Sequence, residues 1–212
     1  MTKITKISGI SVAILLIALD FFVIANSLTL SVGNIINNFI NYSLPCGTLL
    51  GITLLAAIFE KPSKKALSIT TLVLFSVSFA IRVLAIVLYV LEPIFANYLV
   101  VAGFNEYMEL AKYAAFTLLA LGVIFLMIYL RKGKFEKTAL TLGGVSCVAL
   151  FAVWGIYTYS LISSSVEYSA GLFEIFLEFY NGELLRDAVV VISYITSFWV
   201  INEINKEKEK KA

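Results

Sequence analysis

Histidine is absent from this sequence of 212 residues, and cysteine and charge are scarce. The lack of histidine excludes histidine-ligated haem, histidine–zinc sites and Ser-His catalysis. The two cysteines, Cys46 and Cys147, lie in apolar stretches without CxxC spacing, and we interpret them as packing residues. No catalytic, cofactor-binding or metal-binding motif is visible, so the sequence predicts neither an enzyme nor a bound cofactor or metal.

Charged residues make up only 14% of the chain, whereas 60% of it is hydrophobic and the mean hydropathy is +0.95. Soluble domains are about 45–50% apolar, so the composition predicts an integral membrane protein. A net charge of +2 gives no reason to expect a nucleic-acid partner. The expected partner is the lipid bilayer, with other membrane subunits or self-association as open alternatives.

Hydropathy divides the chain into segments long enough to cross a bilayer, which takes about 20 apolar residues. They cover approximately residues 9–31, 37–59, 66–91, 112–130, 138–162 and 184–202. We therefore predict one all-α domain, a bundle of six transmembrane helices. Two further segments are too short to cross. Residues 93–104 follow the helix-breaking Pro93 and are expected to be interfacial or re-entrant, and residues 166–182 form an amphipathic helix on the outer surface.

Thirteen of the sixteen basic residues lie near the ends of the chain or in the two connectors 60–65 and 131–137. By the positive-inside rule this pattern predicts a multi-pass protein of the cell membrane with both termini in the cytoplasm. The exceptions are Arg82, Lys112 and Arg186, which fall within a span or at its outer end. As an alternative, the first segment is a cleaved signal, which would leave five spans.

Arg82 is the costliest residue to place, because an arginine at the centre of a span costs about 2.5–3.5 kcal/mol. It shares one helical stripe with Thr71, Ser78 and Tyr89. Lipid offers these groups no partners, so the stripe should face protein or water. Asp20 lies at a similar distance from the inner end of the first span. The two charges would form a buried ion pair, or line a solute or ion pathway, or else Arg82 would extend towards an outer acidic group.

Four asparagines recur on one face at the start of the second span, namely Asn34, Asn37, Asn38 and Asn41. Pro45 cannot donate to the carbonyl of Asn41 and so frees a backbone acceptor just below them. Carboxamide and carbonyl oxygens suit a hydrated cation or a polar solute, which makes this stripe a candidate polar mouth. The alternative is that the asparagines are solvated among lipid headgroups and bond to neighbouring helices.

The outer ends of the later spans carry further charged and aromatic residues. Arg186 and Asp187 either join the polar mouth or anchor the sixth span at the interface. Lys112 is expected to pair with Glu109, one turn earlier on the same helix. Trp154 fits a belt of aromatic residues at the outer interface.

These features favour a small transporter, channel or solute-binding membrane subunit with a polar cavity on the outer side. The alternative is a non-catalytic structural or accessory subunit of a larger membrane complex, whose polar stripes meet partner helices. The two hypotheses differ in where they place the polar stripes. A pathway places the polar stripes inside the monomer, whereas an accessory subunit places them on its outer wall.

Overall fold

The computed structural model describes residues 1–28, 46–95, 104–168 and 183–211. These ranges contain helices and no strand: α1 (Lys3–Leu28), α3 (Cys46–Ile58), α4 (Lys64–Phe95), α5 (Phe104–Lys132), α6 (Glu136–Tyr168) and α8 (Glu183–Lys211). Five of the six are long and apolar enough to cross a membrane, and α3 is shorter. The predicted second span coincides with α3 from residue 46, and its residues 37–45 lie outside the described ranges.

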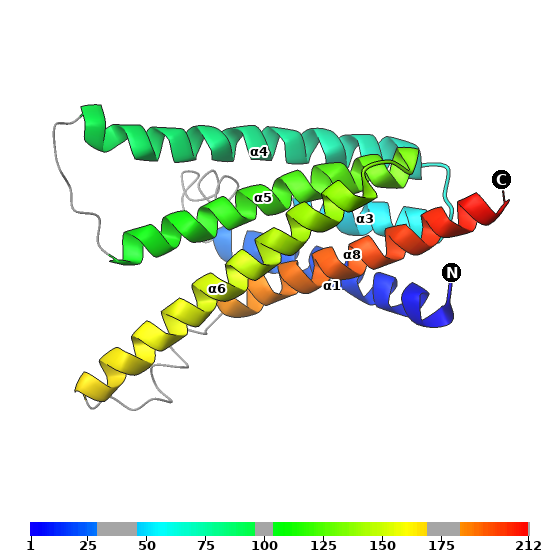
Figure 1. Cartoon of the computed structure of the whole chain (residues 1–212). Coiled ribbons are helices and arrows are strands. Elements are labelled where there is room, and N and C mark those ends of the chain that lie inside the picture. The colour runs from blue at the N-terminus through cyan, green and yellow to red at the C-terminus, as the bar shows by residue number, and fades with distance from the viewer. Residues whose placement is uncertain (29–45, 96–103, 169–182, 212) are drawn as a thin grey trace.

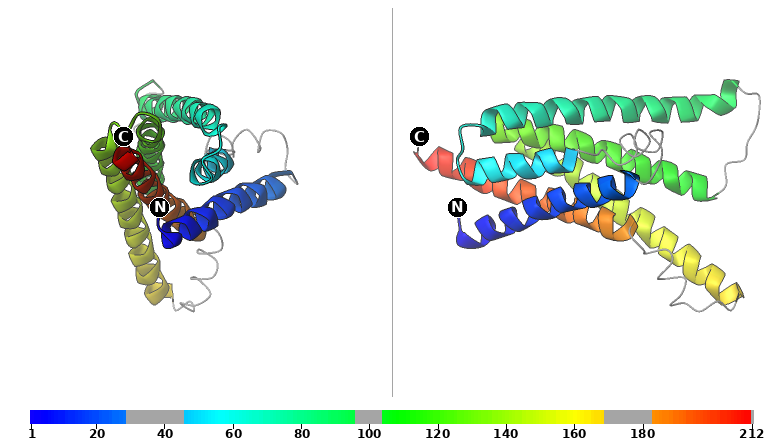
Figure 2. Two further views of the ribbon diagram at one scale, coloured as in Figure 1. Left: turned by 90° about the vertical axis from the view of Figure 1, so that its right-hand side faces the viewer. Right: turned by 180° about the vertical axis from the view of Figure 1, so that it is seen from behind.

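The helices form a bundle in which chain neighbours pack side by side, α1 on α3, α3 on α4, α4 on α5 and α5 on α6. The last helix, α8, contacts α1, α3, α5 and α6. Viewed along the bundle, α8 lies between α1 and α6 (Figure 2, left). It therefore joins the early helices to the late ones.

The two chain ends lie at the same end of the bundle as the α3–α4 and α5–α6 turns (Figure 1). These four places carry the thirteen flanking basic residues of the sequence. We call this end of the bundle the basic end. Its composition is the charge asymmetry on which the positive-inside rule depends.

The turns at the basic end have well-defined helix stops. At the end of α3, Lys61 N–H donates to the carbonyl of Ala56 at 2.8 Å and Glu60 N–H to that of Ala57 at 3.2 Å. This is a Schellman motif, and it places Glu60 in the left-handed region at φ 52°. After α5, Gly133 has the same role at φ 66°, where glycine lacks the Cβ that makes this region costly.

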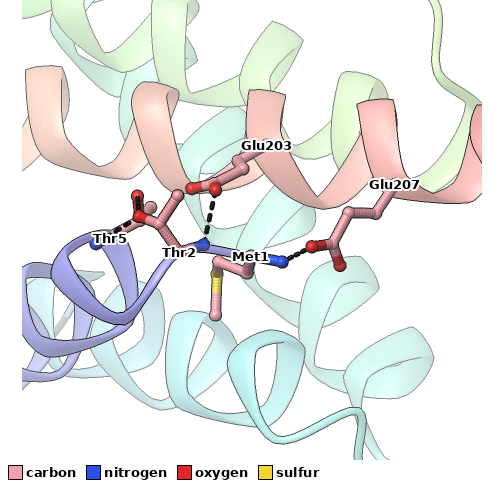
Figure 3. Close-up of polar contacts among 5 residues, drawn as sticks. All are labelled: Met1, Thr2, Thr5, Glu203 and Glu207. Carbon is pink, nitrogen blue, oxygen red and sulfur yellow. Dashed lines mark hydrogen bonds and ion pairs between the residues drawn. The ribbon is translucent and has the colours of Figure 1, made fainter.

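The start of α1 is fastened to the end of α8 at the basic end (Figure 3). The Thr2 hydroxyl accepts the N–H of Thr5 at 3.2 Å, which is the geometry of a helix N-cap. Thr2 N–H donates to the carboxylate of Glu203 at 2.6 Å, and the Met1 amino group pairs with Glu207. The first and last helices are thereby held together.

The last turn of α5 is capped by side chains of α8. Asn205 donates its amide N–H to the Tyr129 carbonyl at 2.8 Å, and Lys208 donates to the Leu130 carbonyl at 3.2 Å. The Tyr129 hydroxyl in turn donates to Asn202 at 3.0 Å. The Tyr129 carbonyl also accepts the N–H of Gly133 at 2.9 Å. The Leu130 carbonyl is one of the last four of the helix, and Lys208 gives it a partner that the helix itself does not provide.

Apolar side chains cover much of the outer wall. Ile14, Phe21, Val77, Leu84, Val148, Phe151 and Ile192 are among the large hydrophobic residues that are exposed there. A soluble monomer rarely exposes so large an apolar surface, whereas hydrocarbon solvates it well. The apolar outer surface is therefore consistent with the transmembrane spans that composition predicts.

Two predicted helix boundaries differ from the structure. α4 continues through Pro93 to Phe95, the last residue described there, so this proline does not stop the helix where the sequence predicted. A proline within a helix removes the backbone bond of a single N–H, and the neighbouring bonds can still form. α6 extends to Tyr168 and takes in the first residues of the predicted amphipathic helix, of which residues 169–182 lie outside the described ranges.

Candidate functional site

The polar face of α4 points into the bundle. Thr71 and Ser78 are buried and Arg82 is only 1% exposed, whereas Val77, next to Ser78, faces outwards. The stripe therefore faces protein, as its polarity predicts. The side chain of its fourth member, Tyr89, lies outside the described residues.

Arg82 lies against two aromatic rings of α5. Its guanidinium carbon is 5.1 Å from the ring centre of Tyr113 and 6.0 Å from that of Phe116. At these distances the negative face of a ring attracts a cation, and the attraction grows when water is excluded. The aromatic residues of α5 thus stabilise a permanent charge within the span.

Asp20 is buried between α1 and α3, with 4% of its surface exposed. Its carboxylate accepts the backbone N–H of Thr48 at 2.5 Å and the hydroxyl of Thr48 at 2.7 Å. Gly47 makes room for it, because a Cβ there would lie 2.8 Å from a carboxylate oxygen. The described role of Asp20 is therefore to accept hydrogen bonds at the beginning of α3, where backbone donors lack helical partners.

The structure does not join Asp20 to Arg82. The ion pairs between described side chains and termini connect Met1 with Glu207 and Lys112 with Asp187. Asp20 of α1 lies against α3, whereas Arg82 of α4 lies against α5. Both charges are buried, but the expected ion pair between them is not among the described contacts.

Lys112, Trp154 and Asp187 come together from α5, α6 and α8, and we call them the three-helix cluster. Lys112 Nζ lies 3.5 Å from Asp187 Oδ2, and the Trp154 indole N–H donates to the same oxygen at 3.1 Å. The Lys112 ammonium also lies 5.1 Å from the ring centre of Trp154. All three residues are at least nine-tenths buried. The cluster therefore holds charges of both signs in the interior.

The three-helix cluster adjoins the site of Arg82 along α5. Lys112 precedes Tyr113 in the sequence, and Phe116 follows one turn after Lys112. The cluster lies towards the end of the bundle opposite the basic end, where α5 and α8 begin (Figure 1). The two regions together bring cations, a carboxylate and three aromatic rings to neighbouring helices.

Two buried hydroxyls on these helices are Tyr113 Oη of α5 and Ser193 Oγ of α8. Neither has a hydrogen-bond partner within the described part of the chain. Buried polar groups are nearly always bonded to protein or to ordered water. A water or solute in the interior would satisfy them. Tyr113 is the more informative of the two because its ring also contacts Arg82.

Sequence reasoning identified Asp187 but missed both of its partners. Lys112 was expected to pair with Glu109, whose side chain lies outside the described residues, and its described carboxylate partner is Asp187. Trp154 was expected in an interfacial belt, yet it is only 9% exposed and donates to Asp187. One signal was available: Lys112 and Asp187 are a basic and an acidic residue, each at the outer end of a predicted span, the fourth and the sixth.

The rest of the predicted polar mouth cannot be placed. The stripe of Asn34, Asn37, Asn38 and Asn41 lies outside the described residues. Arg186 is in the first turn of α8, but its side chain is also outside them. The candidate site that the structure describes therefore consists of Arg82, the three-helix cluster and the aromatic residues of α5.

Within the described ranges, no group of three or more Cys, Asp or Glu residues is arranged to hold a metal ion. Cys147 is a buried free thiol in α6, which agrees with a packing role. Comparisons with protein-family models, with curated proteins and with solved structures found no match to this chain.

Proposed function

We propose that this chain is a multi-pass protein of the cell membrane that binds a small polar solute in its interior and conducts it, as a transporter or channel. The proposal includes six spans and a cytoplasmic basic end, which puts the three-helix cluster in the outer half of the bundle. The observation that carries it is the burial of Arg82, Lys112 and Asp187 within helices that are apolar enough to cross a membrane.

Burial of these charges is energetically unfavourable unless contacts in the interior compensate for the lost solvation. Each charged side chain that leaves water loses several kcal/mol of solvation, and contacts in the interior must offset this loss. For that reason, ionisable residues within spans commonly mark pathways for solutes or ions. Three of them on three neighbouring helices, with aromatic rings beside two, are the elements of a binding site for a charged or polar molecule.

The direction of the α4 stripe favours a pathway over an accessory subunit. If the chain were an accessory subunit, its polar residues would be expected on the outer wall, where partner helices could reach them. Thr71, Ser78 and Arg82 instead face other helices of the same chain, and the outward residues between them are apolar. These three polar side chains of α4 are thus used within the monomer.

Water access to Ser78 tests the proposal. In a background with Cys46→Ser and Cys147→Ala, Ser78→Cys is treated on intact cells with a membrane-impermeant methanethiosulfonate, and unreacted thiols are then counted by a gel-shift label. We expect Ser78→Cys to react, because thiolates form only where water reaches.

Two matched variants control for position. Val77→Cys is next to Ser78 but faces outwards, and Ala57→Cys is buried in the core of α3. Both should stay unreactive, the first in lipid and the second in a dry interior. A Ser78→Cys variant as unreactive as Ala57→Cys would overturn the proposed pathway and favour a purely structural role for the buried charges.

A further inference from the structure

The Lys112–Asp187 ion pair in the three-helix cluster can open and still leave each charge in contact with Trp154. Its N–O distance of 3.5 Å is longer than the roughly 2.7–2.9 Å of a direct charge-assisted hydrogen bond. If Lys112 moves away, Asp187 keeps the indole N–H of Trp154, and Lys112 keeps the face of the same indole ring. Each charge is thus stabilised by a neighbour that does not depend on the pair, which lowers the cost of opening it.

The poorly solvated interior around the three-helix cluster limits the net charge of a solute that can bind there. A solute with a single charge adds that charge to a poorly solvated interior, which is costly. A solute with one carboxylate and one ammonium adds no net charge. It can also replace the Lys112–Asp187 pair by two new pairs, one to each partner.

The neighbouring groups suit both ends of such a solute. A carboxylate that takes the place of Asp187 beside Lys112 would pair with the ammonium that Asp187 now faces at 3.5 Å. An ammonium that takes the place of Lys112 beside Asp187 would lie near the Trp154 ring, whose face attracts cations. The same ring already holds the Lys112 ammonium.

We propose that the three-helix cluster binds a zwitterionic solute by exchange, its carboxylate pairing with Lys112 and its ammonium with Asp187. This inference rests on the proposed function and names the solute class of the same site. A free amino acid provides the carboxylate and the ammonium, and a zwitterionic lipid headgroup provides a phosphodiester anion in place of the carboxylate. In either case both opposite charges of the solute are needed at once.

Trp154 reports the exchange directly. The chain has two tryptophans, so Trp199→Phe leaves Trp154 as the only one. This variant is placed in phosphatidylglycerol nanodiscs, which contain no zwitterionic lipid, and its emission is followed during titration. The probes are alanine and phenylalanine, the matched anions propionate and 3-phenylpropionate, the matched cations ethylamine and 2-phenylethylamine, and glycerophosphoethanolamine, a phosphodiester without net charge, as the lipid headgroup.

We expect a saturable change in Trp154 emission with at least one zwitterion and binding roughly tenfold or more weaker for the single-charge analogues. A response to glycerophosphoethanolamine but not to the amino acids would identify a lipid headgroup, and the reverse would identify a free solute. Equal responses to a zwitterion and to its matched anion or cation would overturn the exchange, and so would no response to any zwitterion.

Asp187→Asn tests the role of the carboxylate, since the amide oxygen can still accept from Trp154 while the charge is lost. We expect zwitterion binding to weaken at least about tenfold. Because this change leaves Lys112 without its described counter-charge, Lys112→Met with Asp187→Asn is made as a charge-neutral variant that should fold and also fail to respond. Retention of wild-type binding by the double variant would overturn the proposal.

The failure of this inference can be told from the failure of the proposed function. If Ser78→Cys reacts with the impermeant reagent while Trp154 responds to no zwitterion, a polar pathway exists and only the solute class is wrong. If Ser78→Cys is unreactive, the pathway itself is absent and the exchange has no route by which a solute could arrive.

Discussion

Tyr194 on α8 donates its hydroxyl to the carbonyl oxygen of Ala139 at 2.6 Å, and its ring occupies the space left by the missing side chain of Gly143. The same ring lies beside Gly122 of α5, where the α5 and α6 backbones approach each other. One tyrosine thus links three helices. Its position depends on the absence of a Cβ on α6.

Gly143→Ala should destabilise the protein strongly. The new methyl group would overlap the Tyr194 ring, and excess volume in a packed core costs about 1–3 kcal/mol. Gly144→Ala is a matched control because nothing lies within 4 Å of the position of its Cβ. The temperature at which half the protein stays monodisperse in size-exclusion chromatography should fall for Gly143→Ala and be unchanged or rise for Gly144→Ala. Equal effects would contradict the contact.

Asp20 and Arg82 should contribute independently to stability. In a double-mutant cycle with Asp20→Asn and Arg82→Met, we expect a coupling energy within about 0.5 kcal/mol of zero, because each side chain has different described neighbours. Asp20→Ala with Thr48→Val is the positive control, since these residues share a hydrogen bond to a carboxylate, which is worth about 1.5–3 kcal/mol. Coupling of Asp20 to Arg82 as large as that of Asp20 to Thr48 would show a direct pair instead.

Glu60→Gly should stabilise the α3–α4 turn. Glu60 has a positive φ of 52°, where a side chain with a Cβ costs about 1–2 kcal/mol relative to glycine. Part of this gain is lost to the greater freedom of glycine in the unfolded chain, so we expect a net gain of about 0.5–1 kcal/mol in the free energy of unfolding. Glu60→Ala keeps the Cβ and should show little gain in the same chemical denaturation experiment. A gain from alanine equal to that from glycine would point to the glutamate charge as the cause.

The α5–α6 turn should be accessible only from the cytoplasm. In the background with Cys46→Ser and Cys147→Ala, Lys134→Cys lies in this turn at the basic end. An impermeant maleimide should label it after the membrane is permeabilised and not in intact cells. Labelling in intact cells would reverse the proposed orientation and would place the three-helix cluster in the cytoplasmic half.

The positions of helices and the inward face of α4 could be predicted from the sequence because both depend on local spacing. Thr71, Ser78 and Arg82 share a face through the geometry of a single helix, whichever helices surround it. Hydropathy likewise located the five long apolar helices, and the described part of the second predicted span is the shorter α3. Helix boundaries are less predictable, as Pro93 shows, because a proline disfavours a helix without always ending it at that residue.

The partners of the buried charges could not be predicted in the same way. Counting residues along two helices gives the depth of Asp20 and of Arg82, but it does not say on which side of the bundle each one lies. Asp187 contacts Lys112 and Trp154 because α5, α6 and α8 pack together at the three-helix cluster. That arrangement is decided by packing across the whole bundle. An alternative on the same helix, such as Glu109 for Lys112, is easier to see in a sequence.

The place of α8 affects the order in which the protein can be completed during synthesis. α8 follows the other described helices along the chain, yet it contacts α1, α3, α5 and α6. While α8 is still being translated, Trp154 lacks the carboxylate of Asp187, the last carbonyls of α5 lack Asn205 and Lys208, and Gly143 faces an empty space. The earlier helices can enter the membrane one by one, but their final packing has to wait for α8.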